Sequence, residues 1–134
     1  PVCTCYVPDV EAVYREVARV TAPGGLYVSQ HKQPVSLQVS VKPGNLGYFL
    51  ETPYYQAGPL PNVSGSPHRE EGTLEFLHRW EPLLGGLCRS GFHIEDLNEP
   101  VHGDSGADAG SFAHRSFFVP PYIRIKARRQ DVMA

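Results

Sequence analysis

The sequence predicts an α/β fold, and three observations lead to it. Near the N-terminus a strand, an amphipathic helix, a Gly-rich stop and a second strand follow one another. Further on, a helix ends at a glycine and leads into a short strand. The last of these segments, 122–128, alternates strictly between apolar and polar residues, as a half-buried strand does. A chain of 134 residues has room for one domain with a substantial core, so we expect residues 1–134 to form a single domain.

The first elements carry clear start and stop signals. Residues 2–7 are rich in β-branched and aromatic side chains and are typical of the end of a strand. Asp9 is suited to cap a helix whose apolar stripe is Val10, Val13, Tyr14, Val17 and Val20. The segment Pro23-Gly24-Gly25 ends that helix, and we expect at least one of the two glycines to have a positive φ. Residues 26–29 then form a short buried strand.

The middle of the chain is less regular. Residues 34–47 contain several prolines and glycines, so we expect irregular structure there. Residues 73–80 alternate in a way that favours a strand pairing back onto 48–55, which gives an inserted β-hairpin. A helix over 73–80, with Leu74, Leu77 and Trp80 on one face, remains an alternative.

The C-terminal third predicts a helix, a strand, a loop and a last strand. The helix opens at Glu81-Pro82, with Leu83, Leu84, Leu87 and Cys88 facing inward. It ends at Gly91, and the strand 93–97 follows. Residues 100–116 are polar and Gly-rich, so we expect a long loop before the final strand 122–128.

Composition and charge exclude several classes of function. Hydrophobic residues make up 41% of the chain and charged residues 19%, and the formal net charge is −2. We therefore expect no general attraction to nucleic acid and no membrane span. The three cysteines are too few for a disulfide framework and suit a reducing cytoplasm. Cys3 and Cys5 would point to opposite faces of a strand, so we expect no metal site.

Three landmarks in order resemble a known enzyme family. Residues 19–25 (RVTAPGG) end a helix just before a strand, residues 87–100 (LCRSGFHIEDLNEP) join a helix to a strand through Gly-Phe, and residues 122–128 form the last strand. This order is similar to the second half of class I S-adenosylmethionine-dependent methyltransferases. The resemblance covers nearly the whole chain, and it implies a Rossmann-like methyltransferase sheet represented by its C-terminal half, with a final antiparallel strand.

The family's cofactor fingerprint cannot be placed in this sequence. It consists of a Gly-rich turn after the first strand and an acidic residue that holds the ribose. The chain also begins at Pro1 inside an apolar stretch, so we expect the N-terminal, cofactor-binding half to be absent. The resemblance then implies S-adenosylmethionine as methyl donor and a small-molecule acceptor, with the 134-residue chain inactive alone. Two alternatives stay open: a non-catalytic binding or dimerisation module, and a small enzyme of another kind with an acid–base histidine.

Candidate site residues follow from the rule that ligands lie beyond the carboxyl ends of strands in open α/β sheets. After the first strand come Cys5, Tyr6 and Val7, which the resemblance places beside the cofactor. After the second come Ser29, Gln30 and His31, which it places nearer the acceptor. His31 is the candidate catalytic base, because histidine titrates near neutrality; a structural histidine is the alternative.

Other candidates for acceptor binding lie in the middle of the chain. His78 and Arg79 precede a helix in a region that shapes the substrate pocket in the family, and Arg79 could hold a carboxylate or a phosphate. Tyr48 and Tyr54 could line an apolar acceptor pocket. Packing against the predicted hairpin is the alternative for all four residues.

Assembly is the last expectation from the sequence. Residues 2–7 carry no charge to deter edge pairing, and the helix presents Val13, Val17 and Val20 on one side. Without further strands, both features need a cover. We therefore expect a homodimer, or a missing N-terminal half that packs there.

Overall fold

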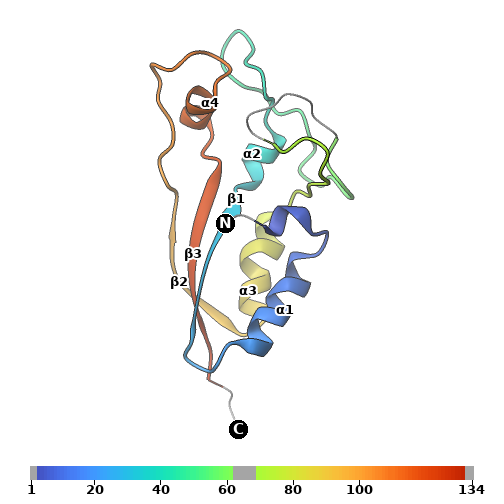
Figure 1. Ribbon diagram of the computed structural model, residues 1–134, viewed down its shortest axis with the longest axis vertical. Coiled ribbons are helices and arrows are strands. Elements are labelled where there is room, and N and C mark those ends of the chain that lie inside the picture. The colour runs from blue at the N-terminus through green and yellow to red at the C-terminus, as the bar shows by residue number, and fades with distance from the viewer. Residues whose placement is uncertain (1–2, 62–68, 132–134) are drawn as a thin grey trace.

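The computed structural model describes residues 3–61 and 69–131 (Figure 1). Three strands form its sheet: β1 (Leu26–Lys32), β2 (Phe92–Asn98) and β3 (Tyr122–Arg129). The α-helices are α1 (Val10–Val20), α2 (Pro34–Gln38), α3 (Gly86–Arg89) and α4 (Phe112–Phe118). Two further helical turns complete the structure. The turn η1 (Thr4–Tyr6) is a 3₁₀ helix, and η2 (Glu81–Gly85) is a π-helix that runs directly into α3.

The sheet has the order β1-β3-β2. Strand β3 is antiparallel to both neighbours, so β1 and β2 run parallel to each other on either side of it. Their carboxyl ends therefore lie at the same end of the sheet, where α2 and α4 are also found (Figure 1). A mixed α/β sheet with a final antiparallel strand confirms the predicted fold class.

The core lies between one face of this sheet and the helices α1 and α3 (Figure 1). Every second side chain of β3 points into it: Ile123, Ile125 and Ala127 are fully buried, as the alternating pattern predicts. The remaining buried members of this core are Val10, Tyr14, Ala18, Leu83, Leu87 and Phe92. The Tyr14 hydroxyl donates to the Leu83 carbonyl over 2.8 Å, which satisfies its only polar group inside the core.

Helix α1 begins as predicted, but the buried stripe is rotated from the predicted one. The Asp9 carboxylate accepts from the amides of Glu11 and Ala12, so it is the N-cap. The most deeply buried residues are Val10, Tyr14 and Ala18, spaced four apart, whereas Val20 is 69% exposed. The helix thus turns part of its valine stripe away from the core.

The helix predicted from Glu81 is also confirmed, with one correction. Leu83 and Leu87 are fully buried and Leu84 is partly buried against the core. Cys88 was expected to face inward, but it is exposed. The π-helical first turn changes the angular spacing of the side chains, so a period of 3.6 residues places Cys88 on the wrong side.

Gly24 has the left-handed conformation that the capping argument requires, with φ of 78°. Its amide donates to the Arg129 carbonyl over 2.8 Å, so the turn after α1 is tied to the end of β3. A Cβ at Gly24 would meet no atom within 4 Å, so the requirement for glycine is conformational only.

We expect Gly24→Val to lower the free energy of unfolding by more than about 1 kcal/mol, the scale of local backbone strain. Gly106→Val is a matched control, because Gly106 is exposed and its φ is not positive. Urea unfolding followed by circular dichroism measures both. Equal losses in the two variants would show that the conformation of Gly24 does not matter.

Two predicted strand regions are not strands. Within residues 3–7 the chain forms the turn η1, in which the Tyr6 amide donates to the Cys3 carbonyl; Val2 lies outside the described residues. The Thr4 and Cys5 side chains are buried, and the Cys5 carbonyl accepts from the Phe76 amide over 2.7 Å. Residues with a preference for strands form one only where a neighbouring strand pairs with them. Here the segment pairs instead with the loop that contains Phe76.

The inserted β-hairpin is wrong. The described part of the chain pairs Leu50 with Val39 in an isolated bridge, and residues 73–79 form no strand. Residues 73–80 do alternate in burial, but on the opposite face: Glu75 and Leu77 are buried, and Leu74 is 58% exposed. A shift of one position reverses which side chains face inward, so an apolar pattern alone misleads here.

Two short helices were missed. Pro34 is the first residue of α2, where the Gln33 side chain accepts from the Val35 amide; a proline interpreted as a breaker is here a starting residue. Helix α4 lies partly inside the predicted loop 100–116, and its N-cap is Ser111, whose hydroxyl accepts from the His114 amide. Within residues 3–61 and 69–131, no helix has both the length and the hydropathy needed to cross a membrane.

Candidate functional site

The predicted end of the sheet carries a cluster of buried polar groups. Strand β1 ends at Lys32, and the turn η1 lies against this strand. The chain segment around Glu75 and His78 completes the cluster through hydrogen bonds to η1 and to β1. Buried polar groups thus gather beyond the carboxyl end of β1, where ligands lie in open α/β sheets.

His31 is held from both ring nitrogens. Its Nδ1 lies 2.7 Å from the Thr4 hydroxyl and its Nε2 lies 2.8 Å from the Ser29 hydroxyl. The ring also meets the edge of Tyr14, and the residue is only 1% exposed. Burial, together with the smaller effect of the nearby His78, lowers the pKa of His31 to about 4. His31 is neutral at pH 7, and its role as a catalytic base stays a prediction.

The turn η1 is held by hydrogen bonds of both its backbone and its side chains. His78 Nε2 lies 2.7 Å from the Thr4 carbonyl, and burial lowers the pKa of His78. Cys5 is 2% exposed, and burial raises its pKa to about 11, so it is a thiol at neutral pH. The Tyr6 hydroxyl donates to Glu70 over 3.0 Å, and burial raises the pKa of Tyr6.

Glu75 is the most deeply buried acid of this region, at 0% exposure. Each of its two carboxylate oxygens accepts a hydrogen bond of 2.8 Å from a cation: Oε1 from Lys32 Nζ and Oε2 from Arg69 Nε. The side chains of Lys32 and Arg69 are both 12% exposed. This triad attaches the segment after residue 68 to the end of β1.

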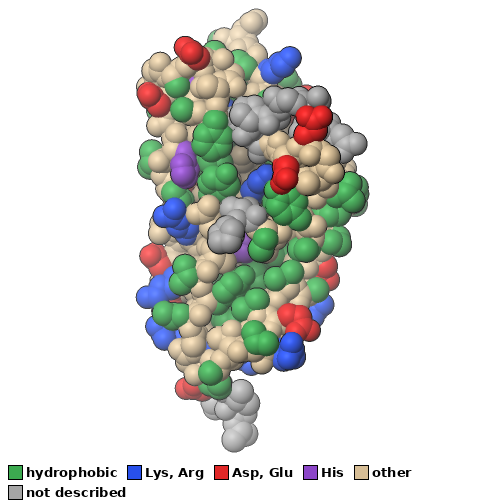
Figure 2. All heavy atoms as spheres, viewed as in Figure 1, with side chains coloured by type: hydrophobic (Ala, Val, Ile, Leu, Met, Phe, Trp, Pro, Cys, Tyr) green, Lys and Arg blue, Asp and Glu red, His purple; other side chains and the backbone are tan. Residues whose placement is uncertain are grey.

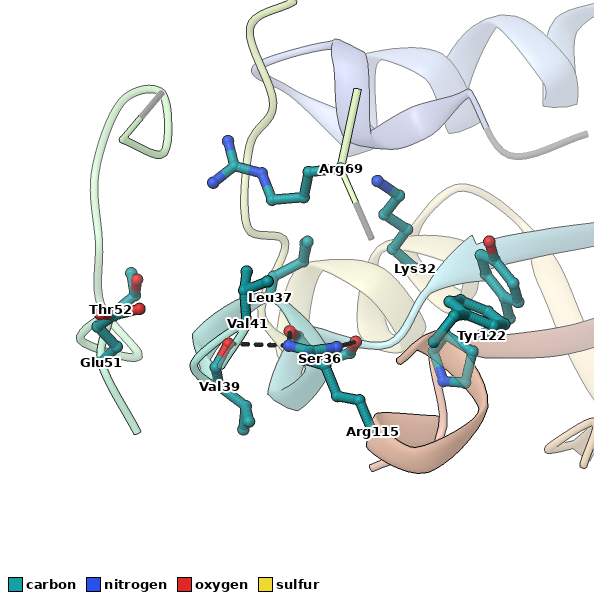
Figure 3. A pocket seen from close by; sticks show the side chains of 12 residues that line it. Lys32, Ser36, Leu37, Val39, Val41, Glu51, Thr52, Arg69, Arg115 and Tyr122 are labelled. Carbon is teal, nitrogen blue, oxygen red and sulfur yellow. Dashed lines mark hydrogen bonds between the residues drawn. The ribbon is translucent and has the colours of Figure 1, made fainter. Parts of the chain in front are cut away.

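A small cavity opens next to the triad, beyond the end of β1 (Figure 3). Its volume is about 50 Å³. Three cationic side chains line it, Lys32, Arg69 and Arg115, together with the carboxylate of Glu51. The other lining residues are Ser36, Leu37, Val39, Val41, Thr52, Phe112, Pro121 and Tyr122. The cavity therefore combines positive charge with a wall of both polar and apolar side chains.

The remaining predicted acceptor-binding residues do not converge on this cavity. Gln30 is on the other face of β1 from His31, where its side chain accepts from Arg124. The Tyr48 hydroxyl lies 2.8 Å from His114 Nδ1 in α4. The Tyr54 hydroxyl accepts from the Trp80 amide over 3.0 Å.

Arg79, the predicted anion holder, is occupied elsewhere. Its guanidinium lies 3.4 Å from Glu81 and stacks over the ring of Tyr55, with the centroid 5.2 Å away. Both side chains of the ion pair are solvent-accessible, at 35% for Arg79 and 69% for Glu81.

Sequence reasoning missed all three cations of the site and the buried acid Glu75. Lys32 follows His31 at the end of β1, so the rule about strand ends could have found it. Arg115 lay in a stretch interpreted as loop, and the serine cap of α4 was the missed signal. Arg69 and Glu75 reach the site only through the path of the segment after residue 68, for which the sequence carries no local signal.

A second feature of the surface is an open apolar groove along α1. Its volume is about 600 Å³, and Val7, Val13, Val17 and Val20 are among its lining residues. Hydrophobic side chains gather over α1 in the space-filling view (Figure 2). Beyond the groove, Leu26 and Val28 of β1 are 48% and 68% exposed.

Comparison with solved structures identifies the class of fold. The chain has the fold of part of an S-adenosylmethionine-dependent methyltransferase, which confirms the predicted resemblance at the level of structure. The sequence itself matches no protein-family profile and no curated protein.

Two solved structures illustrate the match. One is an S-adenosylmethionine-dependent methyltransferase from Mesorhizobium loti, with a TM-score of 0.68 and 24% identity over 96% of this chain. The other is a Listeria monocytogenes protein provisionally assigned to the same class, with a TM-score of 0.71 and 13% identity over 97% of this chain. The chain spans 58% and 59% of their respective lengths.

The described residues do not form a complete site for S-adenosylmethionine. Of the three predicted cofactor contacts, Cys5 is buried and Tyr6 is bonded to Glu70, whereas Val7 lines the open groove on α1. A ribose needs an acidic partner and a methionine tail needs free backbone amides, and no Gly-rich turn of the required kind is found in the sequence. Cys5, Tyr6 and Val7 do not supply these groups with their side chains, and their contact with a cofactor stays a prediction.

Proposed function

We propose that this protein is the acceptor-side part of an S-adenosylmethionine-dependent methyltransferase that acts on a small molecule in the cytoplasm. The observation that carries the proposal is the shared fold, in which β3 is inserted antiparallel between two parallel strands and 96–97% of the chain superposes on such enzymes. The small cavity beyond β1 lies where open α/β sheets bind ligands, which supports an acceptor site at this end of the sheet. The described cysteines are free thiols, which suits a reducing compartment.

In this proposal the chain binds and orients the acceptor, and the cofactor is held mainly by residues outside these 134. Methyl transfer is a displacement in which the protein chiefly positions the reactants, so an acceptor pocket is a large part of the machinery. His31 and the hydroxyls of Thr4 and Ser29 form a hydrogen-bonded group that fixes the end of β1 beside this pocket.

The test compares two lengths of the protein by calorimetry with S-adenosylmethionine. The 134-residue chain is expected to bind it with a dissociation constant well above the low micromolar range, because the Gly-rich turn and the acidic residue are missing. A chain extended by the in-frame sequence upstream of Pro1 is expected to bind it and to contain a Gly-rich βα unit. A start codon close to Pro1 would contradict the proposal, and so would micromolar binding by the short chain.

The groove on α1 favours a second candidate, a non-catalytic module that dimerises. In this reading a second copy of the chain covers Val13, Val17 and Val20, because a symmetric pair buries the same apolar face twice. Light scattering of the purified chain at micromolar concentration is expected to give twice the monomer mass. A stable monomer would contradict this candidate, and loss of the dimer in the longer chain would assign the groove to the preceding segment instead.

A further inference from the structure

The cavity beyond β1 has more positive than negative charge around it. Lys32 and Arg69 share one carboxylate, that of Glu75, so one negative charge serves two cations. The third cation, Arg115, has no carboxylate partner among the residues the structure describes. Among the described residues, Glu51 is the one acid that lines the cavity, and it is exposed.

Arg115 is an unusual side chain to bury in this way. It is 3% exposed, and its acceptors are all neutral oxygens: the carbonyls of Ser36, Val39 and Ser40 and the Ser36 hydroxyl. Figure 3 shows its guanidinium beside Ser36 and Val39 at the cavity wall. A guanidinium has five N–H groups, and these four hydrogen bonds leave one N–H on Nη1 without an acceptor in the described part of the chain.

A buried cation without a counter-charge is costly, so such a site is completed by an anion more easily than by water. Burial lowers the pKa of Arg115, which reflects the same cost. The cavity also lies where the fold places ligands, beyond the carboxyl end of β1. Tyr122 and Phe112 give it an aromatic wall on the side of β3 and α4.

The size of the cavity and the shape of the guanidinium favour a small, planar anion. About 50 Å³ is room for a few waters, since a cavity needs about 10–15 Å³ to hold one. A carboxylate group fits such a space, and its two coplanar oxygens match the planar fork of a guanidinium. A sulfate or a phosphate, with four oxygens arranged as a tetrahedron, is bulkier and matches less well.

We propose that this cavity binds the carboxylate group of a small organic acid, with Arg115 and Arg69 as its main partners. That this acid is the methyl acceptor rests on the function proposed above. The sequence assigned an anion to Arg79 instead, but Arg79 lies in an exposed pair with Glu81 and does not line the cavity. The two assignments can therefore be distinguished. If the cavity binds the carboxylate, binding depends on Arg115 and Arg69; if the sequence prediction holds, it depends on Arg79.

The experiment is a titration of the purified chain with acetate, followed by two-dimensional NMR of the backbone amides and the Arg115 Nε–H. Acetate is expected to shift the signals of Arg115 and Ser36 saturably, with a dissociation constant of order millimolar for a ligand of four heavy atoms. Acetamide, the neutral molecule of the same shape, is expected to bind at least tenfold more weakly. Equal shifts with acetamide, or sulfate binding as tightly as acetate, would overturn the proposal.

Variants locate the binding site. Arg115→Gln is expected to weaken acetate binding at least tenfold; if that variant does not fold, Arg69→Gln is expected to weaken it and keeps the Lys32–Glu75 pair. Arg19→Gln, on an arginine of α1 whose side chain is 71% exposed, is the matched control and should bind acetate as the parent does. Loss of binding in Arg79→Gln, with Arg69→Gln unchanged, would overturn the assignment.

No cofactor takes part in this titration, so its outcome is separate from that of the proposed function. Acetate binding by a chain whose gene lacks a cofactor-binding unit would leave the pocket assigned and the methyltransferase function contradicted. If the chain does not bind acetate and its gene does encode a cofactor-binding unit, the carboxylate site is contradicted and the methyltransferase function is not.

Discussion

Replacing Glu75 with Gln is expected to lower the free energy of unfolding by about 3–5 kcal/mol, the usual cost of removing one partner from a buried ion pair. The substitution keeps the shape of the side chain and removes its charge. Lys32 and Arg69, each 12% exposed, then lie close together without this carboxylate between them. Urea unfolding, followed by fluorescence of the single tryptophan, Trp80, measures the loss.

Glu16→Gln is the matched control for this prediction. Glu16 also accepts from an arginine at 2.7 Å, but both side chains of that pair are about 70% exposed, at 71% and 68%. An exposed pair of this kind contributes about 0–1 kcal/mol, so the control should be nearly neutral. A Glu75 variant as stable as the Glu16 variant would show that the triad does not hold the segment in place.

A triple variant separates charge from packing. Lys32→Met, Arg69→Met and Glu75→Leu together remove all three charges and keep apolar volume. Because well-packed apolar replacements of buried ion networks are often neutral, this variant should be more stable than Glu75→Gln alone. If the triple variant is the less stable of the two, specific geometry rather than unbalanced charge explains the effect of Glu75.

The sequence predicts the elements whose evidence is local, and it fails where distant contacts decide. Asp9, the stripe of α1 and the alternation of Ile123 and Ile125 are local signals, and the structure confirms the helix and the strand they predict. The segment 73–80 also alternates, but its inward face is chosen by Lys32 and Arg69, which come from other parts of the chain and bury Glu75. A pattern that counts only apolar residues cannot predict that an acid takes the core position.

The same limit applies to the candidate site. The rule about strand ends leads to the region of His31 and to its neighbour Ser29, and the structure places both beside the buried turn η1. The cavity itself depends on Arg69 and Arg115, which are brought to it by a loop and by the short helix α4. Short helices are stabilised mainly by tertiary contacts, so their side chains are hard to assign to a site in advance.

The stability of the protein is expected to fall as the pH is lowered from about 6.5 to about 4, and His31 should account for a large part of the fall. In the folded chain burial lowers the pKa of His31 to about 4, whereas the ordinary value is 6.5. The unfolded state therefore binds a proton in this interval that the folded state does not. A shift of this size corresponds to about 3 kcal/mol, fully present above pH 6.5 and lost by pH 4.

His31→Gln tests the assignment, because glutamine keeps hydrogen-bonding capacity toward Thr4 and Ser29 and does not titrate. Its free energy of unfolding should depend less on pH between 6.5 and 4 than that of the parent, whatever its stability at pH 7. His78 contacts the same turn and its pKa is also lowered, so a smaller pH dependence should remain in the variant. His93→Gln, at an exposed position of β2, should keep the parent's pH dependence. If His31→Gln and His93→Gln respond to pH alike, the protonation of buried His31 is not what limits the acid stability of this fold.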